Sequence, residues 1–312
     1  MRALASYILR GPLQAVVIAA VLAVLSPVLP LLAYPSGAVV ALVALQVGAR
    51  QAVTVMAGAC FAVAVAGGLL LPVGFANAAV LAVAFGLIFW LPTWLLAALL
   101  RRTGSLALAF QAAAAIGAAV VLAAFAIAGD PAAAWRSTME AIRPELERAE
   151  LLTSPAQFEQ LVAFAPVITG TMAAFAVLGM ILSLLIARSL QALLHNPGGL
   201  RAEFNRLRYD KVTAIAALVI LAGALLTGSA LAANLAIVMV LLYTFHGLAV
   251  IHGVVAGTGI ASGWLAALYV LIALALLVPQ TGILPHLMVV LALLGLVDTW
   301  WDLRARLPKT GA

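Results

Sequence analysis

The side chains best suited to catalysis or ligand binding lie in one apolar stretch, from Tyr243 to Gly253, with the sequence YTFHGLAVIHG. In a helix, a rotation of 100° per residue places Tyr243, His246 and Gly247 on one broad side and His252 roughly opposite. Two histidines that bind a metal ion from one helix are spaced about four residues apart and share a face. These two histidines do not share a face, so the spacing predicts no metal site.

Tyr243 and His246 could instead line a ligand cavity or hydrogen-bond a neighbouring helix, and the sequence leaves both alternatives open. Gly247 permits another helix to approach on the same side. A buried imidazole that finds no hydrogen-bond partner costs about 1 to 3 kcal/mol, so we expect the protein to use His246 more than His252. Gln111, a polar residue in the first turns of another apolar run, is the third cavity candidate.

The motifs of several enzyme classes are absent from the sequence. It contains no P-loop, no GxSxG, no HExxH and no clustered pair of carboxylates. We therefore predict no enzymatic activity, no catalytic residues and no cofactor. The basic residues flank apolar runs and form no patch with interleaved aromatic residues, so we expect no nucleic-acid partner. The single cysteine, Cys60, lies inside an apolar run and is assigned to packing.

Composition indicates a membrane protein. Hydrophobic residues make up 66% of the chain, charged residues only 8%, and the mean hydropathy is +1.23. We predict an all-α, polytopic bundle of transmembrane helices, one integral membrane domain over residues 1–312, with the lipid bilayer as its surroundings. The ten candidate spans are Leu13 to Leu32, Ser36 to Ala49, Ala52 to Leu71, Ala76 to Leu100, Leu106 to Gly129, Leu161 to Ala187, Val212 to Leu226, Ala230 to Gly253, Ala261 to Val278 and Leu284 to Trp301.

Two of these spans have unusual features. Ser36 to Ala49 is short for a complete crossing, which needs about 20 residues, so eight spans with re-entrant segments are the alternative. In the fourth span, Pro92 lies between Trp90 and Trp94 and is expected to kink the helix. The two indoles are assigned to the membrane interface in preference to gripping a substrate.

A change of composition marks the segment 130–160, which carries six acidic and three basic residues. Asp130-Pro131 and Ser154-Pro155 are typical helix starts, and Pro144 is expected to interrupt the first helix. We predict an acidic loop with one or two short helices, on the periplasmic side.

A second polar segment, 188–211, contains NPGGLRAEFNRLRYDK. Pro197 and the following glycines should end the preceding helix near His195, and a short amphipathic helix should begin at Leu200. One interpretation is that its basic residues only anchor a cytoplasmic loop. The alternative is an interaction loop whose candidate residues are Asn196, Pro197, Gly198, Gly199, Phe204, Arg206 and Arg208.

The distribution of basic residues predicts the topology. With the N-terminus in the cytoplasm, 13 of the 16 Lys and Arg residues lie on the cytoplasmic side, and only Arg136, Arg143 and Arg148 lie outside. This follows the positive-inside rule, so we predict that both termini face the cytoplasm across a bacterial inner membrane. The cytoplasmic set is Arg2, Arg10, Arg50, Arg101, Arg102, Arg188, Arg201, Arg206, Arg208, Lys211, Arg304, Arg306 and Lys309.

Two carboxylates stand one helical turn apart near the end of the last span. Asp302 and Arg306 have the spacing of an ion pair along a helix, which favours a hydrated helix end. Asp298 lies one turn deeper in the span, so it is the more interesting of the two carboxylates.

NPGGLRAEFNRLRYDK after a long apolar run, together with FHGLAVIHG from Phe245 to Gly253, resembles the YybS-like family of uncharacterised bacterial membrane proteins. The resemblance covers most of the chain. It implies a distant similarity of fold to the substrate-binding subunits of energy-coupling-factor transporters, and a more remote one to rod-shape-determining small membrane proteins. Those transporter subunits often present small residues of their first helix to a membrane partner, and Ala15, Ala19 and Ala23 have the matching spacing.

Two functions from different classes remain. The first is a substrate-binding or transport subunit that works with a separate ATPase or coupling subunit. The second is a non-transporting scaffold that recruits proteins of an envelope or division complex through its polar loops. A solvent-reachable pocket among the later spans would favour the first, and a sealed core would favour the second.

Overall fold

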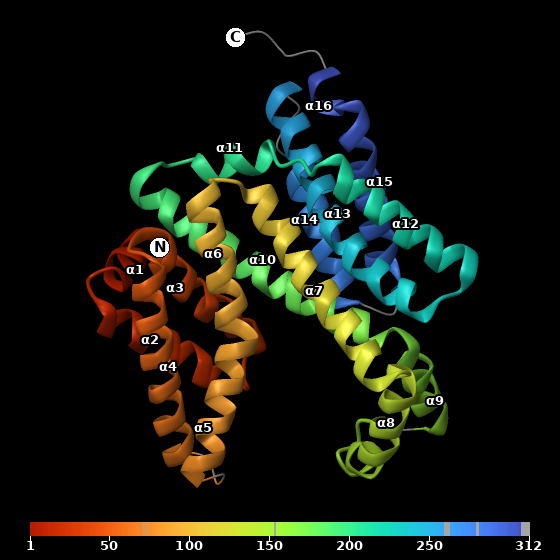
Figure 1. The fold of residues 1–312 in the computed structure, drawn as a ribbon, viewed down its shortest axis with the longest axis horizontal. Helices are drawn as coiled ribbons and strands as arrows, with labels where there is room; N and C mark the ends of the chain where they lie inside the picture. Colours follow the sequence, from red (N-terminus) through yellow and green to blue (C-terminus); the bar gives the residue numbers. More distant parts are fainter. Residues whose placement is uncertain (71, 73, 153, 259–262, 279–280, 307–312) are drawn as a thin grey trace.

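The computed structural model describes residues 1–70, 72, 74–152, 154–258, 263–278 and 281–306, and these residues form helices and connecting turns without any strand (Figure 1). The all-α prediction is therefore confirmed for this part of the chain, while Lys309 lies outside it. The helices are α1 (Arg2–Ile8), α2 (Pro12–Leu25), η1 (Pro30–Leu32), α3 (Ala33–Gln46), α4 (Ala49–Leu70), α5 (Gly74–Phe85), η2 (Gly86–Trp90), α6 (Leu91–Thr103), α7 (Leu106–Ala128), α8 (Pro131–Arg148), α9 (Pro155–Ala163), η3 (Ala165–Val167), α10 (Ile168–His195), α11 (Gly199–Asn205), α12 (Lys211–Thr227), α13 (Ala230–Thr258), α14 (Gly263–Leu277), α15 (Ile283–Trp301) and α16 (Leu303–Arg306).

Each of the ten apolar runs contains one apolar helix or helical segment, but their lengths differ. Among the described residues, six helical segments are long and apolar enough to cross a membrane: 49–70, 74–103, 106–128, 155–195, 230–258 and 283–301. The segments 30–46, 211–227 and 263–277 are shorter. α1 and α2 meet at an angle of 116° and make up one further candidate span if they are counted together. The chain is thus a multi-helix protein with the composition of a multi-pass membrane protein.

The short helix α3 lies inside the bundle. Its residues from Ser36 to Leu45 are all buried, and it packs against α2, α4, α6 and α10. Ser36 donates a hydrogen bond from Oγ to the carbonyl oxygen of Ala19 over 2.8 Å. It also accepts one from the indole nitrogen of Trp90 over 3.0 Å. Helices of this chain, in place of lipid, therefore surround α3, which explains why so apolar a helix can be only 14 residues long.

Two expectations about the N-terminal half are wrong. Trp90 is fully buried against α3, so its indole is no part of an interfacial belt, although Trp94 donates to the carbonyl of Ala49. The small side chains of Ala15, Ala19 and Ala23 are also buried, and α2 packs on α3 and α4. These alanines allow close packing within the chain and are not presented to a partner.

The acidic segment forms the two helices α8 and α9. Asp130 caps α8, because its carboxylate accepts hydrogen bonds from the backbone N–H groups of Ala132 and Ala133. The expected interruption at Pro144 is wrong, since α8 continues through it to Arg148. Figure 1 shows α8 and α9 at the lower end of the molecule, whereas α11 and α16 lie at the opposite end.

Candidate functional site

Helices α13 and α15 touch almost backbone to backbone, and this contact positions the predicted site. A Cβ on Gly247 would lie 1.9 Å from the carbonyl oxygen of Leu291, and one on Gly295 would lie 2.7 Å from the backbone nitrogen of Gly247. Thr244 adds a hydrogen bond from its hydroxyl to the carbonyl of Met288 over 3.1 Å. The close helix contact predicted on the Gly247 side of α13 is confirmed.

A buried chain of charged and polar groups lies beside this contact. The Nε2 atom of His246 is 3.1 Å from Oδ2 of Asp298, and both side chains are fully buried. Arg304 donates to the same carboxylate oxygen over 2.7 Å, and the backbone N–H of Leu303 donates to Oδ1 over 2.9 Å. Asp298 therefore carries a negative charge that Arg304 and the backbone compensate.

The hydrated helix end expected around Asp298 and Asp302 is wrong in two respects. Asp298 has no contact with solvent, and Asp302 pairs with Arg208 over 2.8 Å instead of with Arg306. Arg306 donates to the carbonyl of Trp301. The reason is that α15 ends at its C-cap Asp302, which adopts a left-handed conformation with a φ of 43°, so its carboxylate is not in helical register with Arg306 and pairs with Arg208 from the loop before α12.

Two tyrosines complete the buried cluster. The ring of Tyr209 lies edge-on to those of Tyr243 and His246, and its hydroxyl donates to the carbonyl of Leu242 over 3.2 Å. Tyr209 lies outside the candidate spans, and burial raises the pKa of its phenol well above the ordinary value. The hydroxyl of Tyr243 and Nδ1 of His246 are buried and find no hydrogen-bond partner among the described residues.

Gln111, the third cavity candidate, lies in a different polar contact. Its side-chain amide donates to Oδ2 of Asp210 and to the hydroxyl of Thr213, each over 2.6 Å, and thereby joins α7 to the start of α12. The backbone N–H of Thr213 and the Gln111 amide both hydrogen-bond the Asp210 carboxylate and lower its pKa. Gln111 therefore supports the cap of α12, while Tyr243 and His246 lie together in the buried cluster.

The histidines of α13 have separate surroundings, as their spacing predicts. His252 is partly exposed, lies 2.9 Å from the hydroxyl of Tyr269 and packs edge-on against Phe204. Within the described parts of the chain, no group of three or more His, Cys, Asp and Glu residues could hold a metal ion.

The loop candidates fall into two groups. α10 ends at His195, and Gly198 adopts a φ of 88°, which glycine tolerates and other residues rarely do. Of the exposed candidates, Arg206 follows α11, and the others form the turn before it: Asn196, Pro197 and Gly198. The second group is built into the fold: Gly199 is buried, Phe204 packs on His252, and Arg208 pairs with Asp302 and donates to the carbonyl of Thr299.

Several contacts attach the segment 196–211, called the inner loop below, to the buried cluster. Arg304, which pairs with Asp298, also donates to the carbonyl of Asn205 over 2.7 Å. Arg188 of α10 pairs with Glu203 of α11. The cluster therefore links the ends of α13 and α15 to α11, and its charged side chains are paired in these contacts. Its chemistry is that of a sealed structural network.

The structure also contains a hollow of about 460 Å³ that the sequence analysis did not find. It lies between the connection from α2 to α3, the first residues of α3, the α5–η2–α6 segment and α10. Aromatic and methionine side chains dominate its lining, together with the polar side chains Ser26, Tyr34, Thr93 and Ser183. None of its lining residues is charged. The signal was present, because Thr93 and Ser183 are isolated polar residues in long apolar runs, but the three runs that meet here are distant in sequence.

The helix beside this hollow is irregular. Residues Gly86–Trp90 form a π-helical turn, η2, and Pro92 follows directly at the start of α6. Ile88 and Phe89 of this turn line the hollow. Single π-turns inside α-helices often occur at functional sites. The irregularity in this span is therefore the π-helical turn η2, which directly precedes α6 and Pro92.

Comparison with known proteins identifies no relative. No family model matches the chain, and no curated protein or solved structure is significantly similar to it. The resemblance to the YybS-like family thus stays a prediction.

Proposed function

We propose that this protein is a substrate-binding subunit in the bacterial inner membrane, and that its site is the hollow between the α2–α3 connection, η2 and α10. The observation that carries this proposal is the hollow itself. Its volume of about 460 Å³ falls within the range typical of small-molecule sites, and its apolar lining with a few polar groups is typical as well. Since no nucleotide-binding motif is present, transport would require a separate ATPase or coupling subunit.

The lining indicates the class of substrate. A charged substrate would lose its hydration without gaining an ion pair, because no lining residue is charged. The hydroxyls of Ser26 and Thr93 already donate to backbone carbonyls of their own helices, which leaves their oxygen lone pairs as acceptors. The hydroxyls of Tyr34 and Ser183 also line the hollow and can donate or accept, so the site suits an uncharged, largely apolar molecule with one or two hydrogen-bonding groups.

A large side chain that fills the hollow should prevent the substrate from binding. Ala176 of α10 is an exposed lining residue, so Ala176→Trp would fill the hollow without entering the packed core. We expect a small molecule to co-purify with the wild-type protein and its amount to fall at least about tenfold in Ala176→Trp, a change that corresponds to roughly 1.4 kcal/mol. Mass spectrometry of extracts from equal amounts of folded protein measures this.

The matched control is Val219→Trp, which adds the same side chain on the exposed face of α12. It should leave the bound molecule unchanged. Identical extracts from the wild-type protein and Ala176→Trp would contradict the proposed site.

The topology belongs to the same proposal: ten spans, or eight with re-entrant segments, with both termini in the cytoplasm. The basic loop with α11 and the acidic helices α8 and α9 lie at opposite ends of the molecule in Figure 1, and this arrangement supports it. The hollow is then in the outer half, because α2 ends and α10 begins on the periplasmic side.

Cysteine labelling in intact cells tests this topology. In a Cys60→Ala background, a cysteine at position 147 should react with a membrane-impermeant maleimide, and one at position 206 should react only after lysis. Arg206 is a better position than Asn205, whose carbonyl accepts the hydrogen bond of Arg304. Labelling of position 206 in intact cells would contradict the proposed orientation.

The second candidate function, a scaffold for an envelope or division complex, rests on the sealed Tyr243–His246 cluster and the rigid inner loop. This loop exposes Arg201, Arg206 and Lys211 on a surface that Arg304 and Arg188 hold in place. Crosslinking from position 206 in cells distinguishes the two functions. An ATPase-type partner supports the transport subunit, and envelope proteins alone support the scaffold.

A further inference from the structure

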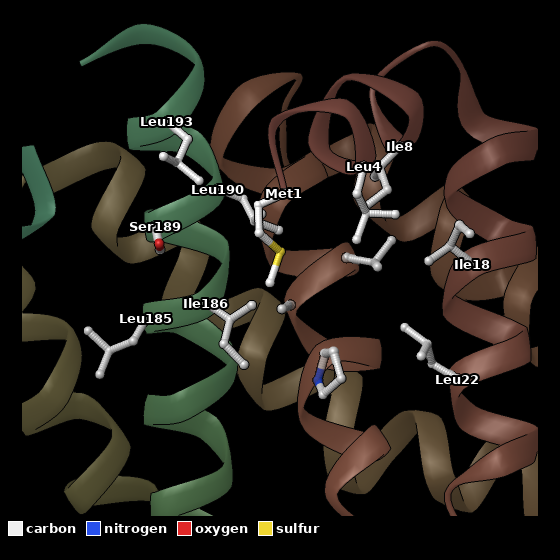
Figure 2. A pocket seen from close by; sticks show the side chains of 13 residues that line it. Met1, Leu4, Ile8, Ile18, Leu22, Leu185, Ile186, Ser189, Leu190 and Leu193 are labelled. Atoms are coloured by element: carbon white, nitrogen blue, oxygen red, sulfur yellow. The ribbon is translucent and has the colours of Figure 1, made fainter. Parts of the chain in front are cut away.

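An apolar groove of about 370 Å³ separates α1 and α2 from α10. Figure 2 shows Ile186 and Leu190 of α10 facing Leu4 of α1 and Ile18 and Leu22 of α2 across it. Ser189 is the one lining residue with a polar side chain. This groove is separate from the proposed substrate hollow, with which it shares no lining residue.

The lining residues determine which kind of ligand can occupy the groove. A polar metabolite would find almost no hydrogen-bond partner there, so it would lose its hydration without compensation. Another helix, about 10 Å in diameter, is too thick for a space of this volume. A flexible hydrocarbon chain meets neither difficulty. The rim is also open, since Leu4 and Leu193 are 43% and 39% exposed, so a chain can enter from the bilayer.

The charges at the two ends of α1, which lines the groove, indicate the headgroup. α1 bends away from α2 by 116° and packs on α10 near the end that leads to α11. Arg2 adjoins the lining residue Met1, and Arg10 lies two residues beyond the lining residue Ile8. Both arginines are exposed, and neither forms a salt bridge within the described residues, although the Arg10 guanidinium lies over the Tyr7 ring, 5.6 Å from its centroid. α1 contains no acidic residue. Cations at this position attract anionic lipid headgroups.

We infer that this groove binds one acyl chain of an anionic phospholipid, with the headgroup held by Arg2 and Arg10, in the leaflet on the α11 side. The apolar lining accounts for the acyl chain, and the two arginines, which have no carboxylate partner among the described residues, account for the negative charge. The site makes α1 a helix that lies in the interface and clamps the lipid against α10.

The test uses the full-length protein, equilibrated with vesicles of equal parts phosphatidylglycerol and phosphatidylcholine and examined by native mass spectrometry. We expect one phosphatidylglycerol to remain bound in preference to phosphatidylcholine. Arg2→Gln and Arg10→Gln should each lower that preference about fivefold, because one basic residue near the surface attracts an anionic lipid by roughly 1 kcal/mol. The charge-matched controls Arg201→Gln and Arg206→Gln should leave it unchanged.

Ser189→Trp fills the groove from α10 and should abolish retention of both lipids, whereas Leu225→Trp on the exposed face of α12 should not. Leu22→Trp fills the same groove from α2. If only Ser189→Trp loses the lipid, the loss reflects a local defect at position 189 and not the filled groove. Size-exclusion profiles confirm that the compared variants are folded. Equal retention of the two lipids by the wild-type protein, or undiminished retention in both tryptophan variants, would overturn the inference.

Discussion

Gly247→Ala is expected to leave little folded protein. The added Cβ would lie 1.9 Å from the carbonyl oxygen of Leu291, 2.6 Å from its carbonyl carbon and 3.0 Å from its Cα, all of them backbone atoms that cannot rotate away. α13 and α15 would have to separate, which would also break the hydrogen bond from Thr244 to Met288. We expect a loss of about 3 kcal/mol or more, at the upper end of overpacking effects. The yield of monodisperse protein and its unfolding temperature in detergent measure this loss.

Gly223→Ala, inside α12, is the control. A Cβ at this position would lie 3.5 Å from the Cβ of Ala232, which is an ordinary van der Waals contact, so the substitution should be neutral or slightly stabilising, because alanine favours the helix. Similar unfolding temperatures for the two variants would contradict the close contact between α13 and α15.

Asp298→Ala is expected to be the most damaging removal of a charge. It takes away the acceptor shared by His246, Arg304 and the N–H of Leu303. The Arg304 side chain, which is only 14% exposed, would keep one carbonyl partner and no counter-charge. Breaking a buried pair in this way costs about 3 to 5 kcal/mol, and the inner loop should loosen as well. Unfolding temperature and proteolysis near Arg206 report the two effects.

Asp302→Ala, one turn away, is the control. Its ion pair with Arg208 is half-exposed, so its loss should cost less than about 1 kcal/mol. The double variant Asp298→Ala with Arg304→Met should regain much of the lost stability, because no buried charge remains uncompensated. If Asp298→Ala and Asp302→Ala behave alike, the buried network does not contribute as the geometry indicates.

Some features of this protein follow from the sequence alone, because they depend on neighbours along the chain. The apolar runs predict the helices, since about 20 apolar residues cannot remain soluble as a loop. Pro197 and the glycines that follow predict the end of α10, and Asp130 before Pro131 predicts the cap of α8. The opposite orientation of His246 and His252 follows from helical periodicity.

Only the tertiary structure decided which helix faces which, because nearly every side of these alanine- and leucine-rich helices is equally apolar. Helical periodicity cannot reveal that Asp298 meets His246, 52 residues away, or that Ala15, Ala19 and Ala23 pack inward. It also cannot assemble the hollow, whose lining comes from separate apolar runs. Which helices pack against each other depends on small side chains and single polar atoms at the helix contacts, such as Gly247 against Leu291. These contacts exist only in the packed bundle.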